Sequence, residues 1–162
     1  MVIIIIVLIQ ISLNKNKQVS ENNTDNNIEN NVIQETEEEQ QNEIKNMSES
    51  NRMKRYVGIF FENIENKNYE KAYNVLNYDF KTTYFPTIEK FEEYAKKHFN
   101  PSTMGVTYDN IERLGNNKTG NMYVLWLTIF NIFNKQESNE TNFVIIENDY
   151  NNYEMSFSVI EE

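Results

Sequence analysis

The sequence contains no cysteine, and only one histidine and four glycines, among its 162 residues. Without cysteine the chain has no disulfide scaffold, iron–sulfur cluster, thiolate zinc site, thiol nucleophile or lipid-modified N-terminal cysteine. A single histidine, His98, is a poor basis for a histidine-rich metal site or a Ser–His–Asp triad, and four glycines do not make a phosphate-binding loop. We therefore expect no cofactor.

Positive charge is also scarce. The chain has 15 lysines and arginines against 25 acidic residues, a formal charge of −10, and its pI is about 4.7. Nucleic-acid binding needs clustered positive charge to neutralise phosphates. The composition therefore excludes nucleic acid as the main partner.

Aromatic residues are missing from the first third of the chain. All 21 lie between Tyr56 and Phe157, and residues 14–49 also lack glycine and proline. Residues 14–49 hold three lysines and nine acidic residues. A segment of this composition cannot bury enough apolar surface to offset its ordering entropy. We predict a disordered acidic linker rich in Asn and Glu over residues 14–49 and a folded domain over residues 50–162.

Residues 1–13 are apolar apart from Gln10 and Ser12. As a helix they would measure about 20 Å, whereas the hydrocarbon core of a bilayer is about 30 Å thick. No basic region precedes them and no cleavage motif follows. We interpret them as a membrane anchor or a truncated signal segment, with the true start upstream and the domain outside. Lys15 and Lys17 alone would place their side in the cytoplasm.

Apolar periodicity predicts two helices at the start of the folded domain. In the first, over about residues 50–66, apolar side chains recur at i, i+3, i+4, i+7 and i+11, which is one helical face; they are Met53, Tyr56, Val57, Phe60 and Ile64. The second, over about residues 68–76, repeats the first four positions of this pattern.

A third helix is predicted after Pro86. Thr87 is a suitable N-cap, lysines lie near the end, and Asn100-Pro101 stops the helix. Residues 77–85, which separate it from the second helix, are expected to be irregular or a short strand.

After Gly105 the apolar period changes from 3.6 to 2, which predicts four strands joined by short turns. The first begins near Val106, and Ile111 and Leu114 indicate a bulge or a change of face within it. The others cover 121–133, 141–147 and 153–159. A sheet with one apolar face must bury that face. The expected fold is α+β, with three N-terminal helices packed on one face of a twisted four-stranded antiparallel sheet, cone-like in shape.

Three runs of residues carry a resemblance to a known family: Tyr56-Val57-Gly58-Ile59-Phe60-Phe61, Asn68-Tyr69-Glu70-Lys71-Ala72-Tyr73-Asn74-Val75-Leu76 and Thr87-Ile88-Glu89-Lys90-Phe91. With the strands that follow, they resemble the nuclear transport factor 2-like (cystatin-like) superfamily over about residues 50–162. The pattern is similar to that of small membrane-anchored extracytoplasmic domains of Gram-positive bacteria. Some of these precede the transpeptidase of methicillin-resistance penicillin-binding proteins, and others belong to conjugation and type IV secretion components. The resemblance implies a cone with a cavity at its wide end.

Enzymes of this superfamily use a carboxylate base and an acidic donor inside the cone. By the resemblance, the candidates are Asp79, Tyr84, Tyr108 and Asp109. The alternative, which we favour, is that both aspartates are exposed loop or edge residues. We therefore assign no catalytic, cofactor-binding or metal-binding residue.

Three other features have a structural interpretation. His98 lies at the end of the third helix, where the helix dipole stabilises its charge. Residues 147–152 offer oxygen ligands but lack the spacing of a calcium loop, so we expect a hairpin turn. Trp126, Phe130 and Phe133 are expected to lie in the core or to line the cone.

Two classes of function follow. The first is a non-catalytic, membrane-tethered extracytoplasmic module at the cell membrane that binds a protein, peptide or cell-wall component. The second is a small pocket enzyme of the isomerase or dehydratase type, which requires a buried carboxylate opposite a tyrosine. A component of a conjugation or type IV secretion complex is a further alternative. Fold alone does not decide among them.

Overall fold

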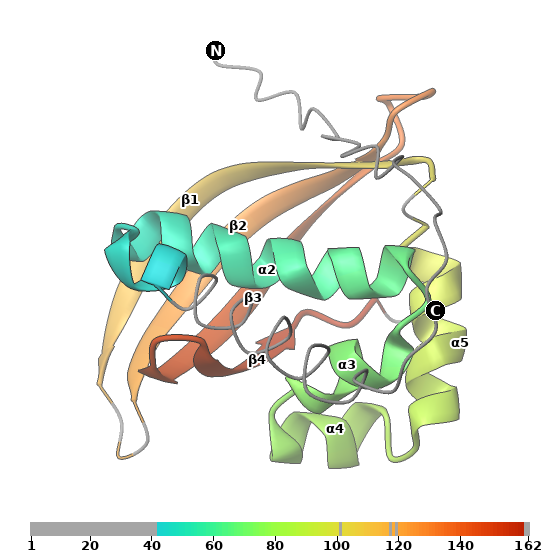
Figure 1. The fold of residues 1–162 in the computed structure, drawn as a ribbon. Coiled ribbons are helices and arrows are strands. Elements are labelled where there is room, and N and C mark those ends of the chain that lie inside the picture. The colour runs from blue at the N-terminus through green and yellow to red at the C-terminus, as the bar shows by residue number, and fades with distance from the viewer. Residues whose placement is uncertain (1–41, 101, 117, 119, 161–162) are drawn as a thin grey trace, which may run out of the picture. The chain divides into compact units, whose positions relative to one another are not determined.

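The computed structural model describes residues 42–100, 102–116, 118 and 120–160. All of these belong to the second of two units into which the chain divides, residues 36–162. The predicted anchor, residues 1–13, lies outside the described residues, as does most of the predicted linker. The helices are α2 (Glu49–Glu65), α3 (Tyr69–Asn74), α4 (Tyr78–Tyr84) and α5 (Ile88–His98), and the strands are β1 (Met104–Asn116), β2 (Asn121–Asn131), β3 (Ser138–Asp149) and β4 (Asn152–Phe157) (Figure 1).

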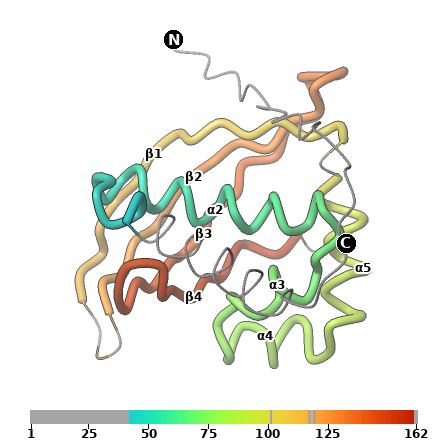
Figure 2. The backbone as a smooth tube through the Cα atoms, viewed as in Figure 1, coloured from blue at the N-terminus to red at the C-terminus, as the bar shows by residue number. Residues whose placement is uncertain are grey.

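The four strands form one antiparallel sheet in the order β1-β2-β3-β4. The predicted α+β class with a four-stranded antiparallel sheet is confirmed. The bulge expected in the first strand is also present, as register shifts between Tyr108 and Asn110 and between Arg113 and Gly115. The helices lie on one side of the curved sheet, and the chain passes through them before it enters β1 (Figures 1 and 2).

Helix α2 is the central element of the helical layer. Ser48 caps it, because its side chain accepts a hydrogen bond from the Asn51 N–H. The five apolar residues predicted to share one face are all buried. Phe60 is fully buried, and its ring lies at centroid distances of 5.5 to 6.1 Å from five other rings, those of Phe61, Phe91, Phe99, Phe143 and Phe157. Burying each such side chain contributes about 1.5–3 kcal/mol.

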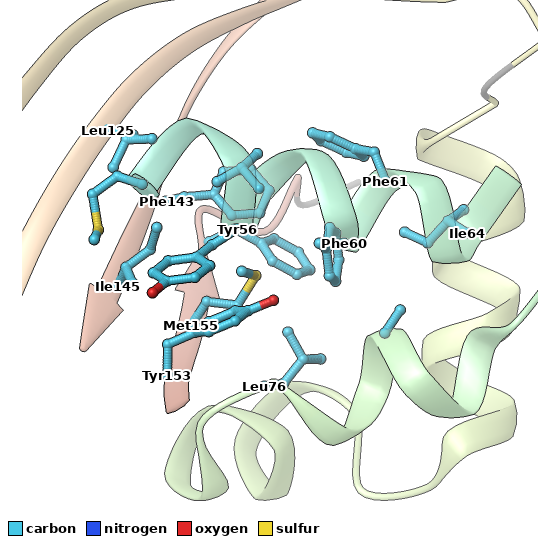
Figure 3. Packing of buried hydrophobic residues seen from close by; sticks show 14 of the residues in the cluster. Tyr56, Phe60, Phe61, Ile64, Leu76, Leu125, Phe143, Ile145, Tyr153 and Met155 are labelled. Atoms are coloured by element: carbon cyan, nitrogen blue, oxygen red, sulfur yellow. The ribbon is translucent and has the colours of Figure 1, made fainter. Parts of the chain in front are cut away.

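The sheet meets these helices with alternate residues. Tyr123, Leu125 and Leu127 on β2 are buried, as are Phe143 and Ile145 on β3. On β4 the predicted alternation is also found, with Tyr153, Met155 and Phe157 facing the core. Figure 3 shows five of the sheet side chains gathered beside the buried face of α2: Leu125, Phe143, Ile145, Tyr153 and Met155. One core therefore joins the helices to the sheet.

The segment between the second and third predicted helices differs from expectation. Residues 78–84, predicted to be irregular or a short strand, form α4. The Asn77 side chain caps this helix by accepting hydrogen bonds from the N–H groups of Asp79 and Phe80 at 3.1 and 3.3 Å. Only Phe80 in the helix is buried. A single buried residue gives no apolar repeat from which a helix could be predicted. The third predicted helix is α5, and Thr87 is its N-cap.

The two edges of the sheet differ. The outer edge of β4 is paired at Met155, which forms a parallel bridge with Leu76 and exchanges backbone hydrogen bonds with Val75 and Asn77 at 2.8 Å. β1 forms the other edge.

The folded part also extends before residue 50. Residues 42–46 form a helical turn, and Ile44 is buried in the core cluster. The last part of the segment predicted as linker therefore supplies a core side chain.

Candidate functional site

A buried polar cluster lies where α2 meets the end of β3. Arg52 and Glu147 are the buried charged residues of the described chain, at 7% and 4% exposure. Arg52 Nε donates to Glu147 Oε1 at 2.8 Å and Nη2 donates to Oε2 at 2.9 Å, which is a bidentate pair. The Tyr56 hydroxyl donates to Glu147 Oε1 at 2.8 Å. We call Arg52, Tyr56 and Glu147 the Glu147 cluster.

Local periodicity places these three side chains together. Arg52 and Tyr56 are four residues apart, so they lie on one face of α2. Glu147 follows Phe143 and Ile145 at the inward-facing positions of β3. A positive charge on the buried helix face thus meets a negative charge on the buried strand face.

The hairpin between β3 and β4 encloses the cluster. Asn151, at a φ of 60°, donates its N–H to the Tyr56 hydroxyl at 3.0 Å. The Arg52 guanidinium lies 5.0 Å from the centre of the Tyr150 ring, and Tyr153 stacks on Tyr56 at 4.0 Å (Figure 3). Arg52 Nη1 also donates to a backbone carbonyl, that of Met47, at 2.9 Å. The polar groups of the cluster are therefore paired.

The electrostatics of the cluster favour fixed charges. The hydrogen bonds to Glu147 raise the pKa of Arg52, which stays protonated. Burial raises the pKa of Tyr56 well above its ordinary value of 10. The Glu147 carboxylate already accepts three side-chain hydrogen bonds. The side chain is 5% exposed, so the carboxylate faces Arg52 and Tyr56 rather than an open space that a substrate could enter.

Next to the cluster, an open groove of about 390 Å³ lies between α2 and β1. Two contacts bridge its sides: Arg113 Nη1 lies 3.5 Å from Glu49 Oε1, and the Tyr108 hydroxyl donates to the Lys54 carbonyl oxygen at 3.2 Å. Tyr123 also lines it. We call this the Tyr123 groove; its other lining residues include Asp109, Asn110 and Ile111.

Tyr123 is the unusual residue of the groove. Its side chain is 1% exposed, and its hydroxyl has no hydrogen-bond partner among the described residues. Burial, followed by the nearby Glu49 carboxylate, raises the pKa of Tyr123, so the hydroxyl stays protonated. A buried hydroxyl without a partner costs free energy. Because the oxygen is shielded from solvent, a group in the groove reaches it only when a covering side chain moves aside.

Of the four residues considered from the sequence as catalytic candidates, the structure brings only two together in one groove. Tyr108 and Asp109 line the Tyr123 groove. Asp109 is exposed and accepts a hydrogen bond from the Thr128 hydroxyl at 2.8 Å. Asp79 and Tyr84 are exposed on α4 and do not line this groove. Both aspartates are exposed as expected, but Asp79 lies in a helix rather than in a loop or at an edge.

The other three features of the sequence have mixed outcomes. His98 ends α5 as predicted, but burial lowers its pKa and Lys97 lowers it further, which favours the neutral imidazole rather than a dipole-stabilised cation. The hairpin turn expected within residues 147–152 is present: Tyr150 and Asn151 join β3 to β4, and the pair Asp149–Asn152 closes the turn. Within the described residues no three His, Asp or Glu side chains are grouped to hold a metal ion.

The prediction that Trp126, Phe130 and Phe133 lie in the core or line the cone was wrong. Trp126 and Phe130 alternate with the core positions, so they are half-buried on the sheet face opposite the helices. Phe130 packs against Gly105, where a Cβ atom would lie 2.5 Å from the ring. Phe133 follows the strand and is 81% exposed. Because β2 carries apolar residues on both faces, its sequence does not indicate which face is buried.

Comparison of the chain with family models, curated proteins and solved structures finds no match. In the part of the chain that the structure describes, no helix is long and apolar enough to cross a membrane.

Proposed function

We propose that this protein is a membrane-tethered extracytoplasmic module that binds a protein, peptide or cell-wall component without catalysis. The apolar residues 1–13 would hold it in the cell membrane, and the acidic segment before the helical turn of residues 42–46 would separate the membrane from the domain. Support for the tether comes from the composition of these segments, which differs sharply from that of the aromatic-rich domain.

One observation carries the preference for binding over catalysis. Glu147 faces the Tyr56 hydroxyl, the arrangement that the isomerase or dehydratase alternative requires, but Arg52 neutralises the carboxylate through two hydrogen bonds. A base must be free to accept a proton from the substrate. The unpaired polar group of this region is the Tyr123 hydroxyl, which suits hydrogen bonding to a ligand.

We further propose that the domain is a cone of the nuclear transport factor 2-like superfamily. Its support is an antiparallel sheet whose buried face is covered by helices from the N-terminal side of the sequence. On this proposal α4 is an additional short helix beside the three predicted from the sequence, and the Tyr123 groove lies at the open end of the cone.

Protease accessibility tests the location of the domain. Intact cells that express the chain with its natural upstream region are treated with an external protease, and an antibody against the folded domain follows the product. We expect the domain to be digested while a cytoplasmic marker protein stays intact. Protection of the domain on intact cells, with digestion only after lysis, would refute the extracytoplasmic location.

A further inference from the structure

We propose that the Tyr123 groove and the outer edge of β1 together bind an extended peptide segment of a partner protein, which adds to the sheet as a fifth strand. The proposal rests on the binding function proposed above and adds to it the site and the class of ligand.

The outer edge of β1 is available for pairing. Among the described residues, no backbone hydrogen bond other than those to β2 reaches the strand. The opposite edge of the sheet is paired at its middle, where Met155 bonds to residues 75–77. An edge strand with unpaired N–H and C=O groups is a template for a further strand.

The bulges of β1 decide where a peptide can pair. They leave two regular stretches, Met104–Tyr108 and Asn110–Arg113. The second stretch also lines the groove through Asn110, Ile111 and Arg113. A peptide that pairs with it therefore runs beside the groove, and alternate side chains point toward the groove. Bulges and charged residues also guard edges against indiscriminate pairing, which favours a selected partner over aggregation.

The groove provides the specificity that main-chain pairing lacks. Its volume of about 390 Å³ accommodates a peptide side chain. Ile111 offers an apolar contact. The buried Tyr123 hydroxyl lies beside the Glu49 carboxylate without a hydrogen bond of good geometry, so it becomes a donor and acceptor for a ligand when Glu49 moves aside. Because the ion pair of Glu49 and Arg113 is about half exposed, opening it to admit a side chain costs little. A side chain with a hydroxyl or carboxamide group fits this lining.

The charge of the lining favours a peptide over a simple ion. Lys54 and Arg113 are balanced by Glu49 and Asp109. A phosphate or another small anion would meet two carboxylates, and a cation would meet two basic side chains. A peptide main chain is uncharged and has both donors and acceptors, so it matches a lining of balanced sign.

The test uses the full chain in detergent micelles and a displayed library of random twelve-residue peptides. A peptide enriched on the chain is then bound to it, and amide hydrogen exchange is measured with and without the peptide. We expect slower exchange at residues 104–113. Methylating alternate amide nitrogens of the peptide should abolish binding, because methylation removes the main-chain donors.

Substitutions locate the peptide in the groove. Tyr123→Phe keeps the ring and removes the hydroxyl, so we expect binding of the enriched peptide to weaken about three- to tenfold. Tyr84→Phe removes an exposed hydroxyl outside the groove and is the matched control, with unchanged affinity. If no peptide is enriched, if protection falls outside β1, or if the two variants bind alike, the inference is wrong.

These results are independent of the location of the domain. A peptide that protects β1 while the domain resists external protease would leave the groove assignment intact and refute the proposed extracytoplasmic function. Digestion of the domain on intact cells without any enriched peptide would refute the groove assignment alone.

Discussion

Glu147 is the residue whose replacement tests the buried polar cluster most directly. Glu147→Gln removes the negative charge and leaves the Arg52 guanidinium buried without a counter-ion. Loss of one partner of a buried pair costs about 3–5 kcal/mol of unfolding free energy. Urea unfolding of the full chain, followed by the fluorescence of Trp126, should show the midpoint falling accordingly.

The control is a second arginine–glutamate pair on the same helix. Arg55 Nη1 lies 2.7 Å from Glu62 Oε1, but both side chains are substantially exposed. Glu62→Gln should therefore cost no more than about 1 kcal/mol. The double variant Arg52→Met with Glu147→Leu should cost less than Glu147→Gln alone, because no charge is left unpaired. Equal losses for Glu147→Gln and Glu62→Gln would contradict a structural role for the cluster.

The sequence indicated the two charged members of the buried cluster, because each lies at a position that the apolar pattern predicts to be buried. Arg52 lies one turn before Tyr56 on the apolar face of α2, and Glu147 continues the inward alternation of β3. Each is a charge of opposite sign in a buried position, and such charges are found paired. The partnership itself could not be derived, because 95 residues separate the two and the topology decides which helix face meets which strand end. For Tyr123, neither the inward orientation, on a strand that is apolar on both faces, nor the lack of a hydroxyl partner could be derived from the sequence.

At the scale of the elements, two glycines have opposite roles. At Gly120, before β2, a Cβ atom would overlap the carbonyl oxygen of Glu147 and lie 2.7 Å from its carbonyl carbon. This neighbour is backbone and cannot move aside, so Gly120→Ala should destabilise the domain by about 1–3 kcal/mol. Gly58 lies within α2 with no atom within 4 Å of its Cβ position. Gly58→Ala should stabilise the domain by about 0.5–1 kcal/mol.

Thermal or urea unfolding of the two variants measures both signs. The same chemical change, one methyl group, is compared at a crowded and at an open position. If Gly120→Ala proves neutral, the β1–β2 turn does not press on the β3 backbone at Glu147. If Gly58→Ala destabilises the domain, the open space beside α2 is filled.

The elements themselves were predictable to different degrees. The long helices α2 and α5 carry several periodic apolar residues and recognisable N-caps, so the sequence alone indicates them. Helix α4 has seven residues and one buried side chain. It is held by tertiary contacts, which include the edge-to-face packing of Phe80 on Phe157 and the hydrogen bond from Asn77 to Glu154 at 2.7 Å. The local sequence pattern gives no information on these contacts, because their partners lie on β4.

At the scale of the whole molecule, composition and period were enough to predict the class and the strand order. The period changes once, after Gly105, and short turns then enforce antiparallel neighbours. The buried face of a strand rich in apolar residues on both sides was not predictable. On β2 both Leu125 and Trp126 could face the core, and only the register with β1 and β3 makes Leu125 the buried one.

The buried tyrosines make the stability of the domain fall at alkaline pH. Burial raises the pKa of Tyr108 and of Tyr153 to about 12, from an ordinary value of 10, and shifts the pKa of Tyr56 in the same direction. Between pH 10 and 12 the unfolded chain releases protons that the folded chain keeps. The stability these groups contribute is therefore complete below pH 10 and is lost as the pH rises through 12.

We expect the free energy of unfolding to fall by about 1.4 kcal/mol per pH unit for each such tyrosine in this interval. Absorbance at 295 nm should show exposed tyrosines ionising first and the buried ones ionising together with the loss of folded structure. Tyr153→Phe should make the decrease of unfolding free energy with pH less steep by the contribution of one tyrosine. Tyr84→Phe, at an exposed position, should leave this pH dependence unchanged. Ionisation of all ten tyrosines near pH 10 in a chain that stays folded would contradict the burial of these rings.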